Sequence, residues 1–211
     1  MNWLILDPHH AGSHAHWAKG MQFHLSQLPD VHAELWTLPG RHWKWRMHGA
    51  CGAFADMAHA ADAPPDVILT TDMLDVAGLR GLLPASWRTT PIALYFHENQ
   101  LTFPWSPGDK EKARNLHSTY AFMNIQSALA ADWIWFNSAY HRRVFLDEGA
   151  AFMRQMPDHT EAYNFEAIAA KSSDLPVGID VANDVDLARP LPGPPIILWN
   201  HRWAYDKGPD R

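Results

Sequence analysis

Four consecutive polar residues, His97-Glu98-Asn99-Gln100, are the residues of this sequence best suited to chemistry. They follow Pro91 and a run of five apolar or aromatic residues, 92–96, which predicts a short strand buried on both faces. In a parallel α/β sheet, ligands bind beyond the carboxyl ends of the strands. The cluster therefore predicts a site at such an edge. The alternative is that these groups only cap the strand and the turn after it.

A second candidate is the turn-rich loop that follows a predicted strand at residues 2–6 and contains Gly12, Ser13 and His14. We expect a helix to begin at about residue 15, so the loop would present backbone N–H groups and a helix N-terminus to a ligand such as a phosphate. The segment is neither a Gly-x-Gly-x-x-Gly motif nor a P-loop. Ser13 has the alternative role of a plain helix N-cap.

Histidines are frequent in this loop, which raises the possibility of a metal site. The chain has 14 histidines, and four of them are His9, His10, His14 and His16. The loop has no cysteine, its nearby carboxylate is Asp7, and no His-Glu-x-x-His motif occurs. We therefore predict no metal, and a metallohydrolase is the least favoured function.

A local basic segment, residues 41–46, is called the basic strip below. Three fixed cations alternate there with two tryptophans; the five residues are Arg41, Trp43, Lys44, Trp45 and Arg46. If the segment is extended, Arg41, Trp43 and Trp45 point to one side. Such a strip could hold phosphates and stack bases or sugars. The alternative is a surface loop with inward tryptophans, but because the chain carries a net charge of −6 we favour binding.

The order of predicted elements indicates an α/β domain with a Rossmann-like parallel sheet. Strands are predicted at 2–6, 31–37, 66–71, 92–96, 133–136 and 175–180. Helices are predicted at about 15–28, 49–61, 73–83, 109–131, 138–146 with Gly149 as its C-cap, and 162–170. Residues 190–195 hold four prolines and one glycine, which is typical of a linker, and residues 196–199 predict a fresh strand. We therefore expect one domain over 1–189, and over 190–211 a linker and the first strand of an otherwise absent second domain.

Composition limits which cellular location and which binding partners are expected. The negative net charge gives no general attraction to nucleic acid or anionic membranes. The single cysteine, Cys51, lies among small residues and is expected to pack in a helix; one cysteine cannot form an intrachain disulfide, which fits a reducing compartment. No signal peptide or run of about 18 apolar residues is present. The expectation is a cytoplasmic protein without a membrane partner.

Six motifs in order along the chain resemble the tRNA-queuosine α-mannosyltransferase family of the glycosyltransferase-4 group. They are Gly12-Ser-His14, Leu38-Pro-Gly40 with Trp43-x-Trp-Arg46, Tyr95-Phe-His-Glu-Asn-Gln100, Phe136-Asn-Ser138, Met156-Pro-Asp-His159, and His201-Arg-Trp203 with Asp206-Lys207. The resemblance implies the GT-B fold, with two Rossmann-like domains facing each other across a cleft. It also implies GDP-mannose as sugar donor without a further cofactor, queuosine in aspartate tRNA as acceptor, and retention of configuration at the sugar.

The resemblance also implies roles for individual residues. Arg202 and Lys207 match positions that hold the donor diphosphate, and a leaving diphosphate needs positive charge. Glu98 could stabilise an oxocarbenium-like state, and His97 could position a hydroxyl. The acceptor and cleft residues would be Gly12, Ser13, His14, Trp43, Trp45, Arg46, Asn99, Gln100, Asn137 and Ser138.

Two alternatives remain open within these expectations. In this family the glutamate-bearing segment that grips the donor lies in the second domain, so this chain alone is expected to catalyse little. A related enzyme with another nucleotide sugar or acceptor is the closest alternative. A stand-alone RNA- or nucleotide-binding module is the alternative of a different class, because it would explain the basic strip without a second domain.

Overall fold

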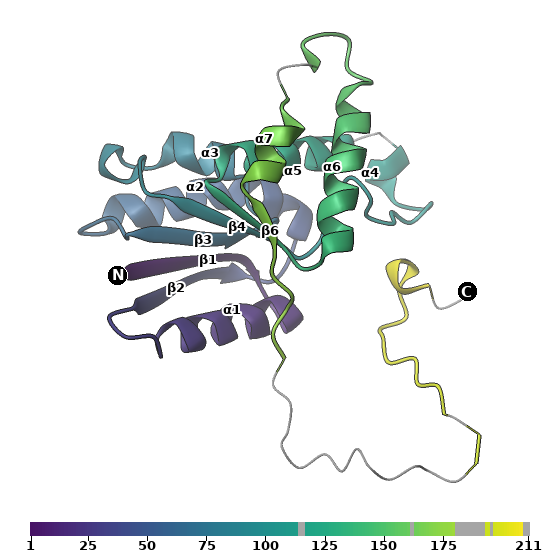
Figure 1. The fold of residues 1–211 in the computed structure, drawn as a ribbon, viewed down its shortest axis with the longest axis horizontal. Helices are drawn as coiled ribbons and strands as arrows, with labels where there is room; N and C mark the ends of the chain where they lie inside the picture. Colours follow the sequence, from purple (N-terminus) through teal and green to yellow (C-terminus); the bar gives the residue numbers. More distant parts are fainter. Residues whose placement is uncertain (114–116, 161–162, 180–192, 195, 209–211) are drawn as a thin grey trace.

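A computed structural model describes residues 1–113, 117–160, 163–179, 193–194 and 196–208 (Figure 1). Its centre is a six-stranded sheet with the order β2-β1-β3-β4-β5-β6, in which every neighbouring pair is parallel. This confirms the predicted α/β class with a Rossmann-like sheet. The strands are β1 (Asn2–His10), β2 (His32–Pro39), β3 (Val67–Thr71), β4 (Ile92–Phe96), β5 (Trp133–Phe136) and β6 (Ser172–Asp174).

Helices cover the two faces of the sheet unequally (Figure 1). One face carries α1, whose Trp17 and Ala18 pack with Ile5 of β1 and Tyr95 of β4. The other face carries α2, α3, α5, α6 and α7, which form the larger core cluster. The helix bounds are α1 (Gly12–Leu25), α2 (Trp43–Ala60), α3 (Val76–Leu82), α4 (Lys110–Ala113), α5 (His117–Ala130), α6 (Ala139–Met153) and α7 (Phe165–Ala170).

Burial on both faces explains why the central strands could be located from the sequence. Ile5 contributes to the smaller core cluster, whereas its neighbours Leu4 and Leu6 contribute to the larger one. All five residues of β4 and all five of β3 are buried. Strands covered on both sides appear as unbroken apolar runs, so the prediction for residues 92–96 is confirmed without a shift, as is that for 133–136.

The basic strip is not extended, and the prediction that its residues alternate between two sides is wrong. α2 begins at Trp43, so Trp43–Arg46 form its first turn, and His42 precedes it with a left-handed φ of 56°. The buried positions Met47, Ala50, Cys51 and Phe54 recur at helical spacing along α2. This apolar stripe extends the helix backward beyond the predicted start at 49. Cys51 is buried in it, as expected for a packing residue.

Other helix boundaries also differ from prediction. α1 begins at Gly12, and its N-cap is Ala11, so Ser13 lies inside the first turn and is not the cap. The helix predicted over 109–131 is described as α4 and α5, with residues 114–116 outside the described part. Gly149 is not a C-cap but an interior residue of α6, where a Cβ would lie only 2.5 Å from the Phe165 ring. Gly149 therefore allows α7 to pack closely on α6.

The strand predicted at 175–180 is wrong, because β6 lies at Ser172–Asp174 and the described residues 175–179 are irregular. The sequence of β6 is polar, so it gave no apolar run from which the strand could have been predicted. Residues 196–199, predicted as the first strand of a second domain, are without regular structure, and none of the described strands pairs with them. Ile196, Ile197 and Leu198 are 79–92% exposed. Most of the predicted linker, 190–192 and 195, lies outside the described residues.

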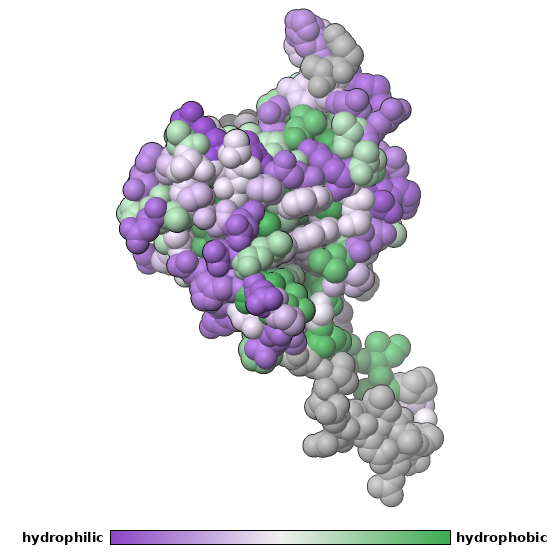
Figure 2. Space-filling model, turned by 60° about the vertical axis from the view of Figure 1, so that its left-hand side comes forward, coloured by the Kyte–Doolittle hydropathy of each residue, from purple (hydrophilic) through white to green (hydrophobic). Residues whose placement is uncertain are grey.

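Hydrophobic surface gathers where the chain leaves the globular part, next to the grey segment in Figure 2. The exposed apolar residues on the two sides of residues 180–192 include Val177, Ile179 and the run Ile196–Leu198. Within the described ranges, no helix combines the length and the apolar character needed to cross a bilayer.

Candidate functional site

The site lies at the carboxyl edge of the sheet, where the strand order reverses between β1 and its neighbours β2 and β3. Open α/β sheets bind ligands at such a switch point. Four segments that leave the strands meet there. They begin with Ala11 after β1, Asp72 after β3, His97 after β4 and Asn137 after β5.

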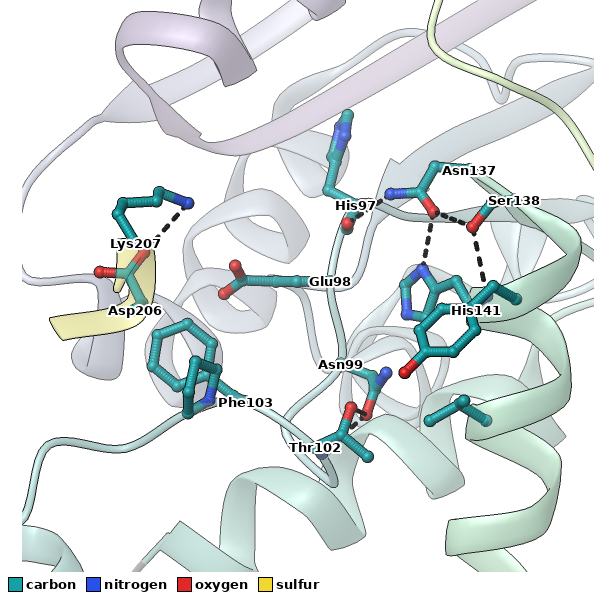
Figure 3. Close-up of a pocket in the computed structure, with 13 residues that line it drawn as sticks. His97, Glu98, Asn99, Thr102, Phe103, Asn137, Ser138, His141, Asp206 and Lys207 are labelled. Carbon is teal, nitrogen blue, oxygen red and sulfur yellow. Dashed lines mark hydrogen bonds and ion pairs between the residues drawn. The ribbon is translucent and has the colours of Figure 1, made fainter. Parts of the chain in front are cut away.

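Two adjoining cavities form a cleft at this edge. The α6-side cavity, of about 260 Å³, lies between the His97–Asn99 turn and residues Asn137, Ser138 and His141 (Figure 3). The α1-side cavity, of about 550 Å³, is lined by the Gly12–His14 turn, Trp43, Met73 and Arg202 among others. Glu98, Phe103, Asp206 and Lys207 line both cavities. Figure 3 shows the Glu98 side chain pointing toward Asp206 and Lys207.

The turn after β4 is held in place by partners distant in sequence. The His97 N–H donates to Asp72 Oδ1 at 2.8 Å, and the His97 carbonyl accepts from Asn137 Nδ2 at 2.7 Å. The Gln100 N–H donates to Asn124 Oδ1 at 2.9 Å, while Asn124 Nδ2 donates to the Asp72 carbonyl at 3.0 Å. The ends of β3, β4 and β5 and the middle of α5 therefore fix the backbone of this turn together.

Within the predicted polar cluster, the four side chains have different surroundings. Asn99 lines the α6-side cavity, but its Oδ1 accepts from the N–H and the hydroxyl of Thr102, at 3.0 and 3.2 Å, and so closes the turn. Gln100 is buried below the cleft, lines neither cavity, and donates through Nε2 to Glu98 Oε1 at 3.2 Å. Only His97 and Glu98 of the four combine exposure to a cavity with a titratable group.

The imidazole of His97 is enclosed by other rings. Its centroid lies 4.9 Å from that of His14, 4.7 Å from Trp17 and 4.8 Å from Tyr95. Burial, with smaller contributions from His14 and His141, lowers the pKa of His97 to about 3. His97 is therefore neutral at pH 7. Among the described residues its Nε2 is buried and has no hydrogen-bond partner.

His14 and His141 repeat this pattern on the two sides of the cleft. Burial is the main cause of the lowered pKa of His14, and burial lowers the pKa of His141 to about 4. His141 Nδ1 lies 3.1 Å from Asn137 Oδ1. The cleft is thus lined by neutral imidazoles, which can donate and accept hydrogen bonds without adding positive charge.

Two carboxyl groups lie at the base of the cleft. Burial raises the pKa of Glu98, against the opposing charge of Lys207. Asp72 is completely buried, and burial together with the charge of Glu98 raises its pKa well above the ordinary value. The sequence prediction missed Asp72. Its signal was the same as that of His97, because Asp72 is the first residue after a buried strand.

The cations of the cleft come from the C-terminal segment. Asp206 Oδ2 lies 3.3 Å from a guanidinium nitrogen of Arg202 and 3.0 Å from Lys207 Nζ. Burial raises the pKa of Asp206, but the hydrogen bonds and charges of the two cations outweigh burial and lower it. Arg202 and Lys207 thus both lie against one carboxylate, in an arrangement that could also hold a phosphate oxygen.

Asn137 and Ser138 connect β5 to α6. Ser138 is the predicted N-cap, and its Oγ accepts from the N–H of His141 at 3.2 Å. The Ser138 hydroxyl also donates to Asn137 Oδ1 at 3.2 Å. His141, one turn after Asn137, was missed by the sequence prediction. His141 follows the predicted cleft residue Asn137 by four residues, which is about one helical turn, and this spacing could have indicated it.

Only part of the basic strip reaches the cleft. Trp43 lines the α1-side cavity, whereas Trp45 lines a separate cavity. Arg46 Nε donates to the Pro39 carbonyl at 3.2 Å and lines neither cavity of the cleft. Gly40 is required just before the strip, because a Cβ there would lie 2.1 Å from that of Ala11. The structure therefore does not bring Trp45, Arg46 or Gln100 into the cleft with the other predicted residues.

The four histidines predicted to lie in a loop after residue 6 are in regular structure, because β1 continues to His10 and α1 begins at Gly12, and they do not assemble a set of metal ligands. His10 Nδ1 lies 2.6 Å from Asp7 Oδ2, and the ring centroids of His9 and His14 are 5.9 Å apart. Across the part of the chain that the structure describes, no group of three or more His, Cys, Asp or Glu side chains is arranged to hold a metal ion.

Comparison with known proteins adds an independent line of evidence. Residues 2–179 match the family described as tRNA-queuosine alpha-mannosyltransferase N-terminal. A Drosophila melanogaster protein named tRNA-queuosine alpha-mannosyltransferase is 30% identical over 215 residues, covering 98% of this chain and 54% of that protein. The chain therefore spans about half the length of this curated relative.

Proposed function

The chain belongs to the tRNA-queuosine alpha-mannosyltransferase family, and from this premise we propose that it is the N-terminal, acceptor-side part of a GT-B glycosyltransferase. The proposed reaction transfers mannose from GDP-mannose to the queuosine base of aspartate tRNA, with retention at the sugar. Residues 1–189 would form the acceptor-side domain, and residues 190–211 would lead into a donor-binding domain.

The single observation that carries this proposal is the cleft in which Glu98 faces Lys207 and Arg202. Breaking the bond between mannose and diphosphate leaves negative charge on the phosphate oxygens. Fixed cations stabilise that charge, and Arg and Lys supply it without proton transfer. The proposed role of Arg202 and Lys207 is to bind the diphosphate as it leaves.

The wall of the cleft opposite Arg202 and Lys207 carries the groups proposed to act on the sugar. Mannosyl transfer passes through an oxocarbenium-like state, and a carboxylate nearby stabilises its positive charge. Glu98 is proposed for this role. His97, which is neutral and lines the α6-side cavity, is proposed to orient a hydroxyl of mannose or of queuosine. We assign no general base.

The acceptor is proposed to approach along α2. Trp43 lines the α1-side cavity, and the basic strip to which it belongs carries positive charge in a chain whose net charge is −6. Phosphates of a tRNA would be attracted to such a surface. A tRNA acceptor is also consistent with the cytoplasmic location that the sequence predicts.

The experiment that tests the proposal begins with the intact mass of the native protein purified from its source. A mass well above 23.9 kDa supports a donor-binding domain in the same polypeptide. The native protein is then incubated with labelled GDP-mannose and two aspartate tRNAs, identical except that one carries queuosine and the other guanine at that position.

Label in the queuosine tRNA alone supports the proposal. Equal labelling of both tRNAs would show that queuosine is not the acceptor, and transfer from UDP-glucose in place of GDP-mannose would show a different donor. RNA binding without any sugar transfer, by a native protein of 23.9 kDa, would favour the binding-module alternative.

A further inference from the structure

A cavity outside the cleft lies between the start of α2 and α5, and it is called the α2–α5 cavity below. Its volume is about 420 Å³, and its walls are His42, Trp43, Lys44, Trp45, His48 and Tyr120. Small-molecule sites typically occupy about 300–1,000 Å³. The rings of Trp43 and His48 lie 5.7 and 5.1 Å from that of Tyr120, so the walls are largely aromatic.

Trp45 gives this cavity a large exposed ring. Its side chain is 64% exposed, although tryptophan is usually well covered. The ring lies against the backbone of Gly49, one helical turn later, where an added Cβ would be 2.7 Å from two ring atoms. The glycine therefore provides the space for one face of the indole, and much of the rest of the ring remains accessible to a planar ligand.

Basic residues lie at and beside the cavity. Lys44 lines it, and Arg41 and Arg46 flank it in sequence. Lys44 has a structural partner: its Nζ lies 3.0 Å from both carboxylate oxygens of Asp109 and 5.0 Å from the centroid of the Trp105 ring. Aromatic platforms beside basic groups are typical of surfaces that bind single-stranded nucleic acid.

Trp43 connects this cavity to the cleft, since it lines both the α2–α5 cavity and the α1-side cavity. A nucleic-acid strand that delivers one nucleoside to the cleft would carry a nearby nucleotide past Trp43. We infer that the α2–α5 cavity binds an unpaired nucleobase of the acceptor RNA, stacked on Trp45, close to the nucleotide that enters the cleft. This inference rests on the proposed function, because it takes the acceptor to be an RNA loop.

The test uses a fluorescent RNA hairpin with the sequence of the aspartate tRNA anticodon stem-loop, and a set of hairpins in which each loop base in turn is replaced by an abasic ribose. Affinities are measured by anisotropy at one fixed salt concentration for the wild-type chain, Trp45→Ala, Trp45→Phe and Gly49→Ala. Trp133→Ala is the matched control, because Trp133 is 45% exposed at the opposite, amino-terminal edge of the sheet.

Base–aromatic stacking predicts that Trp45→Ala weakens binding by roughly 5- to 150-fold. Trp45→Phe should recover part of this loss. Gly49→Ala keeps the indole but removes its space, so it should weaken binding by less. At one loop position, the abasic hairpin should bind the wild-type chain as weakly as the intact hairpin binds Trp45→Ala. The same abasic hairpin should bind Trp45→Ala no more weakly than the intact hairpin does. This non-additivity indicates direct contact between that base and Trp45.

Three results would overturn the inference. One is wild-type affinity in Trp45→Ala. Another is an equal loss at every abasic position in both proteins. The third is a change from dimer to monomer in Trp45→Ala, by sedimentation, with RNA affinity unchanged, which would assign the ring to contact with a second copy of the chain.

The result also separates this inference from the proposed function. Sugar transfer to queuosine tRNA with no effect of Trp45 on RNA affinity would overturn the stacking site alone. Failure of the wild-type protein to bind any of the RNAs would overturn both.

Discussion

The two walls of the cleft are built in opposite ways. The His97–Gln100 turn is buried or half-buried and is held by hydrogen bonds to Asp72, Asn124 and Asn137, which lie 24–40 residues away in sequence. The Arg202–Lys207 segment is held by ion pairs within itself, between residues one and four positions apart. The Arg202 side chain is 73% exposed.

The difference shows that the fold fixes one wall of the cleft, whereas short-range ion pairs alone hold the other. Buried hydrogen bonds cannot be lost without leaving unsatisfied polar groups, so the first wall is fixed before any ligand arrives. Exposed ion pairs contribute little to stability and exchange readily for other partners. The first wall is therefore suited to orienting a sugar, and the second to taking up and releasing phosphate charge.

The largest expected effect on stability comes from a substitution that removes support from the fixed wall, the His97–Gln100 turn. Asn124→Ala removes the partner of both the Gln100 N–H and the Asp72 carbonyl, and each buried group left unsatisfied costs about 1–3 kcal/mol. We expect the free energy of unfolding to fall by roughly 2–6 kcal/mol, measured by urea denaturation. Arg202→Ala serves as the contrast and should change it by less than about 0.5 kcal/mol. Equal losses in the two variants would contradict the comparison.

The next effect concerns the charged wall. Lys207→Ala, in the protein at its native length, should weaken GDP-mannose binding by roughly 10- to 150-fold, the range expected for a lost hydrogen bond between charged groups. Calorimetric titration measures the affinity, and unfolding should be unaffected. Lys19→Ala, at an exposed position on α1, is the control for loss of a lysine. Unchanged affinity in Lys207→Ala would remove Lys207 from the donor site.

The neutral histidine of the fixed wall predicts a pH dependence. The pKa of His97 is about 3 in the folded chain and 6.5 ordinarily, so between these values the unfolded chain binds a proton that the folded chain does not. Stability therefore falls as the pH falls from 6.5 toward 3, by about 1.4 kcal/mol per pH unit for this group. The raised pKa values of Glu98 and Asp72 act in the opposite direction in both the wild type and a His97 variant.

The difference between the profiles of wild type and His97→Gln isolates the histidine. Urea denaturation at several pH values should show a slope smaller by about 1.4 kcal/mol per pH unit in the variant. His24→Gln, at an exposed position on α1, controls for the loss of an imidazole. Parallel profiles for wild type and His97→Gln would mean that His97 titrates alike in the folded and unfolded chain.

The smallest effect sharpens the description of the charged wall. Asp206 lies against both Arg202 and Lys207, so a phosphate must compete with its carboxylate. Asp206→Asn should therefore raise the affinity for GDP by about 1.5- to 5-fold at low salt, as expected for an ion pair near the surface. The exposed Asp158, beyond the end of α6, provides the control substitution. Weaker GDP binding in Asp206→Asn would instead mean that the carboxylate orients the two cations.

The sequence allowed prediction of the parallel sheet type, of β4 and β5 without a shift, and of the polar turn after β4, because buried central strands are continuous apolar runs. It did not allow prediction of the conformation of the basic strip. Alternating tryptophans and cations match a strand over six residues, and only the buried stripe from Met47 onward shows that a helix begins at Trp43. No capping side chain marks that start, since His42 makes no capping hydrogen bond.

Residues that act through others were the harder part of the site to predict. Asn124 supports the His97 turn from α5, and nothing local in its sequence separates it from an ordinary polar residue, whereas Asp72 directly follows the buried strand β3. The strand expected at 196–199 belongs to the predicted second domain, and none of the described strands pairs with it. The residues have strand-like composition, but pairing depends on a neighbour that the composition of one segment cannot supply.

The central position of β1 has a consequence for synthesis on the ribosome. β1 pairs with both β2 and β3, so one of its two edges is left without a partner until residues 67–71 have been made. At typical translation rates, this delay is on the order of 3–13 s. The apolar sequence Trp3-Leu4-Ile5-Leu6 is exposed to other nascent chains during that time. Chaperone capture of about the first 60 residues is therefore expected to influence the yield of the folded protein more than chaperone capture of any later segment of the sheet does.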